Sequence, residues 1–436
     1  MLNKMTIQNK VESTHYSSFM LFLVFSYALS SISFHQLGNI FLGLLIVGTL
    51  PIFIIHKNKI FKDPIVIIFF LIIIIQIISW INSIFYLPEF ANEIPKLDRL
   101  GKLFIFFFIA FWLKGSLKNI VLLWLFYIFG FILAIGINTD ITSIVKTVDA
   151  QQIVDLSIKN HQWDSMLAGT ALLMSLSLFY LAVKSSIFSS KLKILVLIGV
   201  SLLVLLFIYL VIVTQARQVW LGLISAIIIG PLAYFIIHKI TNLKFLLVGF
   251  SLTIGLLFLF STSSIVQERI SKEQDVISSI FDKDKQIQMS SIGIRINTWI
   301  EAEEWIKKHP FIGLDSEAIP EVIQQSNRFD NNLKKNFGHL HNFFIETLVA
   351  YGFIGFFLIL ALYYFIIKSI LSSSLSTQEK KHYLLVSIIF TTYWIVINNF
   401  ETFNSRSLGV FVHNLVFASF YTFYLTDYLK TDNQST

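Results

Sequence analysis

Apolar residues run along this chain in blocks of about 20, and charged residues gather in the segments between them. A helix of that length crosses the hydrocarbon core of a bilayer. Twelve such blocks occur, at 17–35, 38–56, 64–87, 100–114, 119–138, 165–183, 194–213, 218–237, 245–261, 342–367, 383–398 and 408–426. The block 100–114 is short, so it spans only if Lys102 and Lys114 reach the headgroups or the helix extends back through Arg99. The pattern predicts an all-α polytopic membrane protein with about twelve transmembrane helices.

Most of the segments between the blocks are short, but two are not. They divide the chain into helices 1–9 with the loop 139–164 (residues 1–261), a loop domain (262–341), and helices 10–12 with a C-terminal tail (342–436). A loop of this length carries structure and function of its own. Within it, 294–308 has the spacing of an amphipathic helix with tryptophans on its apolar side, suited to the membrane surface.

The charges predict which segments lie inside the cell. Only 14% of the residues are charged, against about a quarter in soluble domains. If the N-terminus is cytoplasmic and the blocks alternate, the inside segments hold sixteen lysines and five acids, and the outside segments hold seventeen basic residues and twenty-one acids. This distribution obeys the positive-inside rule, so we expect both termini in the cytoplasm and both long loops outside. The basic excess follows from topology and requires no nucleic-acid partner.

Several kinds of chemistry have no sequence support. The chain has no cysteine, hence no disulfide or thiolate, and no phosphate-binding glycine loop or HExxH motif. His309, His339 and His341 lack the spacing of a metal site, so we predict neither a metal nor a cofactor. Lys4 and Lys10 precede an apolar run that is too long for a signal peptide, and we expect an uncleaved first span.

Arginine is distributed differently from lysine. All six arginines fall in segments predicted to be outside: Arg99, Arg217, Arg269, Arg295, Arg328 and Arg406. A guanidinium binds phosphate through two parallel hydrogen bonds, so their placement predicts an anionic lipid head group such as a pyrophosphate. The alternative is that they pair with outside acids or stabilise loops. Asp164 and Glu401 are further candidates at this edge, for sugar or phosphate contacts or for structural roles.

The segment NFGHLHNFFIETLVAYGFIG (336–355) places a proton-transfer group at a membrane boundary. Asn342 is predicted to cap the apolar helix that follows. The positive end of its dipole favours a neutral imidazole, so His341 is a candidate base. His339 is interpreted as a hydrogen-bonding support for the loop. Glu346, inside the span, either orients an imidazole or pairs with an arginine, since an unpaired carboxylate there is costly.

Four outside segments form a pattern when taken together. They are TQARQVWL (214–221), SIGIRINTWIEAEEWIKKHPFIG (291–313), HLHNFFIETLVAYGFIG (339–355) and NSRS (404–407). In this order, on these spans, they resemble the bacterial O-antigen ligase family, within a superfamily of ligases and polymerases that are polytopic membrane glycosyltransferases. Of these features, the arrangement His-Asn, nine residues, Gly, two residues, Gly is the most specific.

The resemblance implies a GT-C-like glycosyltransferase in the bacterial inner membrane, with its active site at the periplasmic face. Such enzymes transfer an O-antigen glycan from undecaprenyl pyrophosphate to a sugar hydroxyl of lipid A-core, without a metal and with inversion at the anomeric carbon. Carried over by motif position, His341 is the general base, and Arg217 and Arg295 bind the donor pyrophosphate. The supporting candidates are His339, Asn342, Glu346, Arg406 and Arg99, and the partners are these two substrates and membrane lipids.

Two other functions remain open from the sequence. An O-antigen polymerase or a protein O-oligosaccharyltransferase would use the same donor with a different acceptor. The HLHN motif and the lack of a large soluble C-terminal extension favour a ligase. A transporter or flippase is disfavoured, because the candidate residues cluster at one membrane face and not at the midplane.

Overall fold

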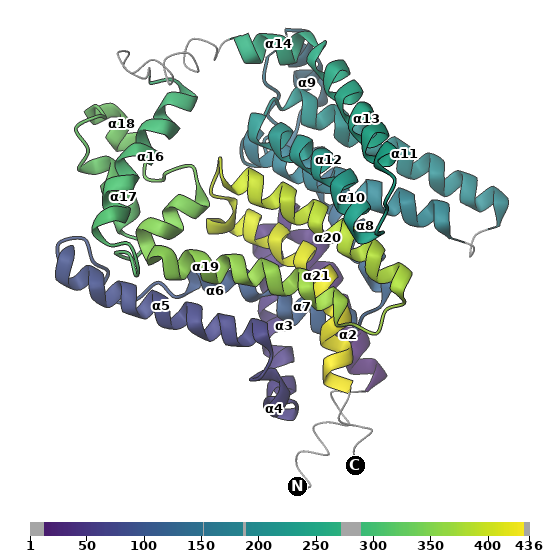
Figure 1. Cartoon of the computed structure of the whole chain (residues 1–436), viewed down its shortest axis with the longest axis horizontal. Helices are drawn as coiled ribbons and strands as arrows, with labels where there is room; N and C mark the ends of the chain where they lie inside the picture. The colour runs from purple at the N-terminus through teal and green to yellow at the C-terminus, as the bar shows by residue number, and fades with distance from the viewer. Residues whose placement is uncertain (1–12, 151, 186–188, 272–288, 431–436) are drawn as a thin grey trace.

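The structure is a computed structural model that describes residues 13–150, 152–185, 189–271 and 289–430 (Figure 1). Helices and loops make up these ranges, and no strand occurs in them, so the predicted all-α polytopic fold is confirmed. The predicted cytoplasmic termini, including Lys4 and Lys10, and the loop segment 272–288 lie outside the described residues.

Nine helices of the described ranges are long and apolar enough to cross a membrane. They are α2 (Thr14–Ser33), α3 (His35–Ile55), α5 (Pro64–Tyr86), α8 (Leu117–Asn138), α10 (His161–Lys184), α11 (Ser190–Val213), α12 (Arg217–Ile237), α19 (Phe343–Leu371) and α21 (Ser407–Lys430). The shorter or more polar helices are α4 (Lys57–Ile60), α6 (Asp98–Gly101), η1 (Lys102–Phe104), α7 (Phe106–Leu113), α9 (Ile141–Asp149), α13 (Leu243–Ser261), α14 (Ser264–Ser271), α16 (Ser291–Lys308), α17 (Ala318–Gln324), α18 (Asn331–Asn336), α20 (Thr377–Asn398) and η2 (Phe403–Ser405). The nine support a multi-pass membrane protein.

The other three predicted blocks are also helical, so a count of twelve stays a prediction. In α13 the longest run of described side chains is the apolar stretch Leu246–Gly255, and the first turn of α20 holds the charged residues Glu379 and Lys380. The block 100–114 is divided among α6, η1 and α7. Asn414 of α21 satisfies backbone groups at this break. Its Oδ1 accepts from the Phe106 N–H at 2.7 Å, and its Nδ2 donates to the Lys102 carbonyl at 3.0 Å. Without such a partner, these backbone groups would lie unsatisfied in an apolar surrounding.

Polar residues set the starts of the helices. Asp63 accepts from the Ile65 N–H at 2.8 Å at the start of α5, and Pro64 takes the first helical position, where no N–H is needed. Ser376 and Glu379 form a reciprocal capping box at the start of α20. These caps satisfy amide groups that the first turn of a helix leaves open.

Helix α21 occupies the centre of the bundle (Figure 1). It packs against α7 and α19, while α19 also packs along α5. On the other side, α12 packs against α20, and α10 against α11. The loop helices α16 and α17 lie against α19, at the end of the molecule where α5 and α19 meet (Figure 1).

A loop crosses α19 where that helix is broken. Gly352 has φ +60° and ψ −166°, which interrupts the helical hydrogen bonds. The segment 310–315 replaces them: Phe353 and Ile354 N–H donate to the carbonyls of Pro310 and Phe311 at 2.7 and 3.2 Å. In return, Leu314 and Asp315 N–H donate to the carbonyls of Val349 and Ala350 at 3.1 and 2.8 Å.

The two backbones cross in close contact, and α5 fixes the crossing. A Cβ at Gly352 would overlap the Phe311 carbonyl carbon, and one at Gly313 would overlap the carbonyl of Ala350. Ser79 of α5 accepts from the Asp315 N–H at 2.7 Å and donates to the Ala350 carbonyl. Gly313 of the Pro-x-x-Gly motif and Gly352 of the His-Asn motif are therefore two halves of one backbone crossing.

Substituting Gly352 tests this crossing. Gly352→Ala should destabilise the protein by roughly 3 kcal/mol or more, because its dihedral angles are nearly restricted to glycine and the added methyl group meets backbone. Thermal unfolding of the purified protein in detergent, followed by size-exclusion chromatography, measures the effect. Gly199→Ala is the matched control, since Gly199 lies within α11 with open space around its Cα. Equal melting temperatures for the two variants would contradict the assignment.

Candidate functional site

The turn before α19 is held on both sides of its backbone. Asn342 caps α19 as predicted, because its Oδ1 accepts from the N–H groups of Phe344 and Ile345, both at 3.0 Å. The Leu340 N–H donates to Glu346 Oε1 at 3.0 Å, and the Leu340 carbonyl accepts from Trp299 Nε1 at 2.8 Å. This clamp places the flanking histidines.

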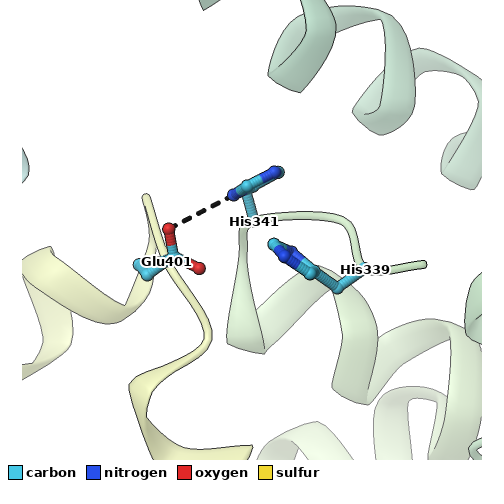
Figure 2. Close-up of side chains that lie close together, drawn as sticks. All are labelled: His339, His341 and Glu401. Carbon is cyan, nitrogen blue, oxygen red and sulfur yellow. Dashed lines mark hydrogen bonds and ion pairs between the residues drawn. The ribbon is translucent and has the colours of Figure 1, made fainter. Parts of the chain in front are cut away.

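His341 itself adopts a left-handed backbone conformation, with φ +51°. A non-glycine residue is uncommon there and stays only where its surroundings hold it. Its Nδ1 lies 3.2 Å from Glu401 Oε2, and the rest of the ring points away from that carboxylate (Figure 2). A neutral imidazole that donates Nδ1–H to Glu401 keeps its lone pair on Nε2.

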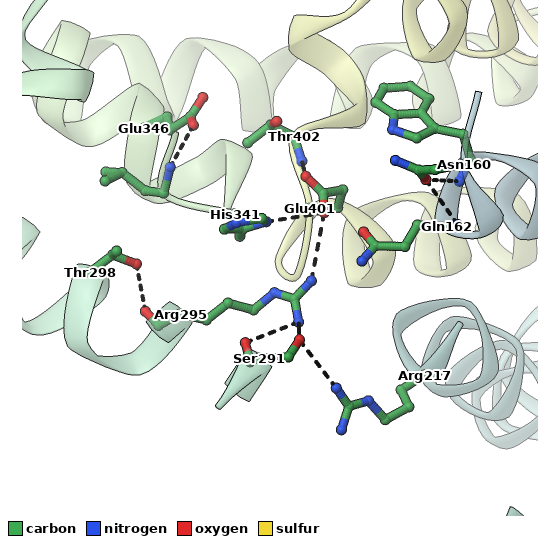
Figure 3. A network of polar contacts seen from close by, with 12 residues as sticks. Asn160, Gln162, Arg217, Ser291, Arg295, Thr298, His341, Glu346, Glu401 and Thr402 are labelled. Carbon is green, nitrogen blue, oxygen red and sulfur yellow. Dashed lines mark hydrogen bonds and ion pairs between the residues drawn. The ribbon is translucent and has the colours of Figure 1, made fainter. Parts of the chain in front are cut away.

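Glu401, in the turn after α20, is the acid that both His341 and Arg295 contact. Its Oε1 accepts from the Thr402 N–H at 3.2 Å, and Arg295 Nη2 lies 3.7 Å from its Oε2 (Figure 3). Burial alone would raise the pKa of this carboxyl. The hydrogen bond from His341 and the nearby positive charges outweigh burial and lower the pKa to about 2. Glu401 is therefore a carboxylate at neutral pH.

His339 stands beside this pair without joining its hydrogen bonds. Its ring centroid is 3.9 Å from that of His341, and its buried Nδ1 has no hydrogen-bond partner among the described residues. Burial, with the adjacent His341, lowers its pKa to about 4, so the ring is neutral at pH 7. The expected hydrogen-bonding support of the loop is not seen among the described residues, and the ring contact with His341 is observed in its place.

Arg217 and Arg295 come together across the loop, although 78 positions separate them in the sequence. Arg295, in the second turn of α16, is nearly buried and donates to Ser291 Oγ at 3.2 Å. Arg217, the first residue of α12, donates to the same hydroxyl at 3.4 Å (Figure 3). The two guanidinium groups thus meet at one hydroxyl, with Glu401 on the far side of Arg295.

Helix α16 buries polar residues and leaves its apolar side partly exposed. The sequence predicted an apolar side made of Ile296, Ile300 and the tryptophans, suited to the membrane surface, and that location stays a prediction. In the structure Arg295, Thr298 and Ala302 are buried, and the apolar side chains are partly exposed. Arg295 contacts Glu401, while Ile296 and Trp299 line a pocket.

An apolar groove begins at the two arginines and follows α12. A pocket of about 430 Å³ has Arg217 and Arg295 in its wall together with Trp220 and Ile224. Trp220 and Ile224 also line a second pocket, of about 580 Å³. This second pocket shares Gly230 and Pro231 with a third pocket, of about 340 Å³. The chain of pockets reaches Tyr234, about 25 Å along the helix axis from Arg217.

Glu346 is a second buried acid that serves the turn. Its side chain is 2% exposed, and its Oε2 accepts from Arg99 Nη2 at 2.6 Å. Arg99 also donates to Ser405 Oγ at 3.3 Å. Both residues line a polar pocket of about 310 Å³, together with His339 and Arg406. Of the two roles that the sequence left open for Glu346, pairing with an arginine is the one observed.

A metal ion is poorly accommodated by this arrangement. His339, His341 and Glu401 bring potential ligand atoms within 4.8 Å of one another. However, Arg295 already contacts Glu401, and a guanidinium opposes a divalent cation at that oxygen. His309 was the third histidine weighed as a metal ligand with His339 and His341. Its ring packs instead against Tyr86, with 4.6 Å between the ring centroids.

The structure thus brings together His339, His341, Arg217 and Arg295, with Asn342 and Glu346 as local supports, and it puts Arg99 and Arg406 at the polar pocket. From the sequence, Glu401 was only one of several edge candidates, although an acid beside the last outside turn was a usable signal.

Lys159 was not predicted from the sequence. Its amine lies 3.7 Å from the Trp163 ring centroid, near Glu401 and Arg406. Asp164 is buried and accepts from the Leu156 N–H at 2.7 Å, which is a structural contact.

Removing Glu346 should cost more than removing an exposed acid. Glu346→Ala leaves the Arg99 guanidinium unpaired and the Leu340 amide without its acceptor, so we expect a loss of about 3 kcal/mol or more. Glu303→Ala, on the exposed side of α16 and paired with Lys307, should change stability by less than about 0.5 kcal/mol. Thermal melting of both purified variants makes the comparison, and similar losses would argue against a role of Glu346 in the turn.

Comparisons with known proteins bear on the same region. Residues 202–360 match a family model described as O-antigen ligase. An uncharacterized protein of Haemophilus influenzae is 27% identical over 151 residues, which make up 34% of this chain and 37% of that protein. The chain therefore spans little more than a third of this relative. Residues 202–360, which match the family model, contain Arg217, Arg295 and His341. This match supports a function of the ligase or polymerase type. Together with the motifs inside it, the match over residues 202–360 supports the O-antigen ligase family for this chain.

Proposed function

We propose that this protein is an O-antigen ligase, which transfers an O-antigen glycan from undecaprenyl pyrophosphate to a sugar hydroxyl of lipid A-core. One observation carries the proposal. Glu401 contacts His341 on one side and Arg295 on the other, and Arg295 shares Ser291 with Arg217. A candidate base and two candidate phosphate ligands therefore belong to one connected group, as glycosyl transfer from a lipid pyrophosphate requires.

His341 is the proposed general base. Its Nδ1 is engaged by Glu401, so Nε2 is the nitrogen that receives the proton of the acceptor hydroxyl. The Glu401 carboxylate fixes the ring and stabilises the imidazolium that forms, in the manner of a third group that orients a base. Glu401 is thus a positioning residue, and the left-handed backbone of His341 is the strain that this orientation entails.

Arg217 and Arg295 are proposed to bind the donor pyrophosphate. Negative charge grows on the departing phosphate as the glycosidic bond breaks, and preplaced guanidinium groups stabilise it. The apolar groove supports this assignment, because it starts at these two arginines and extends about 25 Å along α12. If the pyrophosphate head group bound to these arginines, the isoprenoid chain of the donor would lie in the groove.

The proposed reaction is a single displacement. The acceptor oxygen forms a bond to the anomeric carbon of the donor sugar, and the bond from that carbon to the pyrophosphate oxygen breaks. The electron pair leaves with undecaprenyl pyrophosphate, and the proton of the hydroxyl passes to His341. Attack opposite the leaving group inverts the anomeric configuration. No step requires a metal or a cofactor.

The membrane arrangement belongs to the same proposal. We place the protein in the bacterial inner membrane with residues 262–341 as a periplasmic loop domain, 1–261 as nine spans, and 342–436 as three spans and a cytoplasmic tail. In favour of this arrangement, α16, the start of α12 and the start of α19 meet at one end of the bundle (Figure 1). The positive-inside charge distribution makes that end periplasmic.

Replacing His341 in a deletion strain tests the function. The deletion should leave lipid A-core without O-antigen while glycans accumulate on the carrier lipid, and wild-type protein should restore lipopolysaccharide. His341→Ala should lower transfer by about 100-fold or more, because a general base contributes at least that much. Silver-stained lipopolysaccharide gels and analysis of carrier-linked glycan measure the two pools.

The same experiment separates the related functions. His35→Ala is the control, since His35 is exposed at the start of α3 and should not affect transfer. Single repeats on lipid A-core in the deletion strain would indicate a polymerase instead, and intact lipopolysaccharide with unglycosylated protein would indicate a protein transferase. Full activity of His341→Ala would exclude it as the base.

Lysine substitutions test the pyrophosphate assignment. Arg217→Lys and Arg295→Lys should each lower transfer about tenfold or more, because an ammonium keeps the charge but loses the bidentate fork. The control is Arg328→Lys, at a half-exposed arginine that pairs with Glu301. Initial rates with purified lipid-linked donor give the comparison. Wild-type rates in the first two variants would refute the assignment.

A further inference from the structure

The polar pocket is lined by none of the residues that line the pocket at the two proposed donor arginines. Its volume is about 310 Å³, and its walls come from the segments around α6, α17, the histidine turn, and the turn between α20 and α21. Gly338 and His339 form the wall nearest to His341, whose ring is 3.9 Å from that of His339 between centroids. The His339 ring thus contacts both the pocket and the ring of the proposed base.

Four cations and three acids line this pocket, and the acids are already paired. Arg99 binds Glu346, and ion pairs also join Lys96 to Glu317 and Lys102 to Asp98. The Arg406 side chain is exposed, and no hydrogen bond or ion pair joins its guanidinium to a described residue, although Glu346 lies close enough for the two charges to attract. With four cations and three acids, the pocket keeps an excess of one positive charge.

The surroundings of Arg406 are suited to an oxygen-rich anion. Thr402, Ser405 and Ser407 line the same pocket, so three residues that carry hydroxyl groups accompany the guanidinium. Lys159 lies close enough to Arg406 for that charge, after burial, to lower the pKa of the amine. An anion at Arg406 would offset the repulsion between these two cations, which the charge of Glu401 already reduces on the Lys159 side.

We propose that this pocket is the acceptor subsite, and that Arg406 recognises an anionic substituent, a phosphate ester or a carboxylate, on the acceptor saccharide. The inference rests on the proposed function, because it takes His341 as the base. One set of arginines then serves each substrate: Arg217 and Arg295 the donor, Arg406 the acceptor. A saccharide anchored through its anion at Arg406 would present a hydroxyl past His339 to His341, and the neutral His339 would not compete for the anion.

Binding of simple probes tests the subsite in the full-length protein in lipid nanodiscs. Glucose 6-phosphate represents the phosphate ester, glucuronate the carboxylate, and glucose the neutral sugar. At least one anionic probe should bind more tightly than glucose in saturation-transfer NMR. Arg406→Gln should weaken that binding about tenfold or more, because a guanidinium–anion pair is charge-assisted and bidentate. The probe that loses affinity identifies the anion, and Arg328→Gln is the control.

Kinetics separate this inference from the proposed function. With purified donor and lipid A-core, Arg406→Gln should raise the KM for the acceptor about tenfold while the KM for the donor stays unchanged. Equal probe binding by the variant and the wild type, or an unchanged acceptor KM, would overturn the subsite. Transfer that survives His341→Ala would instead overturn the base while leaving anion binding at Arg406 intact.

Discussion

The crossing of the 310–315 segment over the break in α19 is the constraint on which this structure depends. Four backbone hydrogen bonds and two glycines lock the loop to the helix at Gly352, ten residues after the Asn342 cap. The crossing ties the end of α16 to the interior of α19, and the bond from Trp299 to Leu340 joins the same two elements nearer the site. Arg295 on α16 and His341 before α19 are thereby held in one rigid frame.

Two buried carboxylates organise the polar residues within that frame. Glu401 engages the imidazole of His341 and the guanidinium of Arg295, and Glu346 engages the backbone beside His341 and the guanidinium of Arg99. Each acid has its negative charge balanced by an arginine, which is how an ionised group persists in an apolar surrounding. The two arginines line different pockets, Arg295 the apolar groove and Arg99 the polar pocket. This division matches two chemically different substrates.

The sequence predicted the features that depend on local pattern. Apolar blocks located the helices, and Asn342 before a run of apolar residues located the start of α19. It could not predict contacts that depend on tertiary packing, such as the one between His341 and Glu401, 60 residues apart. The burial of Arg295 on α16 could not be predicted for the same reason, because a pattern of apolar residues does not reveal a distant acid that pairs with the arginine. The hydrogen bonds at the break in 100–114 come from Asn414, which is 308 residues from Phe106 in the sequence.

The broken helix also couples the loop to the bundle. If α19 kept its break without the loop, the carbonyls of Val349 and Ala350 and the amides of Phe353 and Ile354 would lose their loop partners. In an apolar surrounding, each unsatisfied group costs several kcal/mol. Docking of the loop therefore favours the broken form of α19 over a continuous helix.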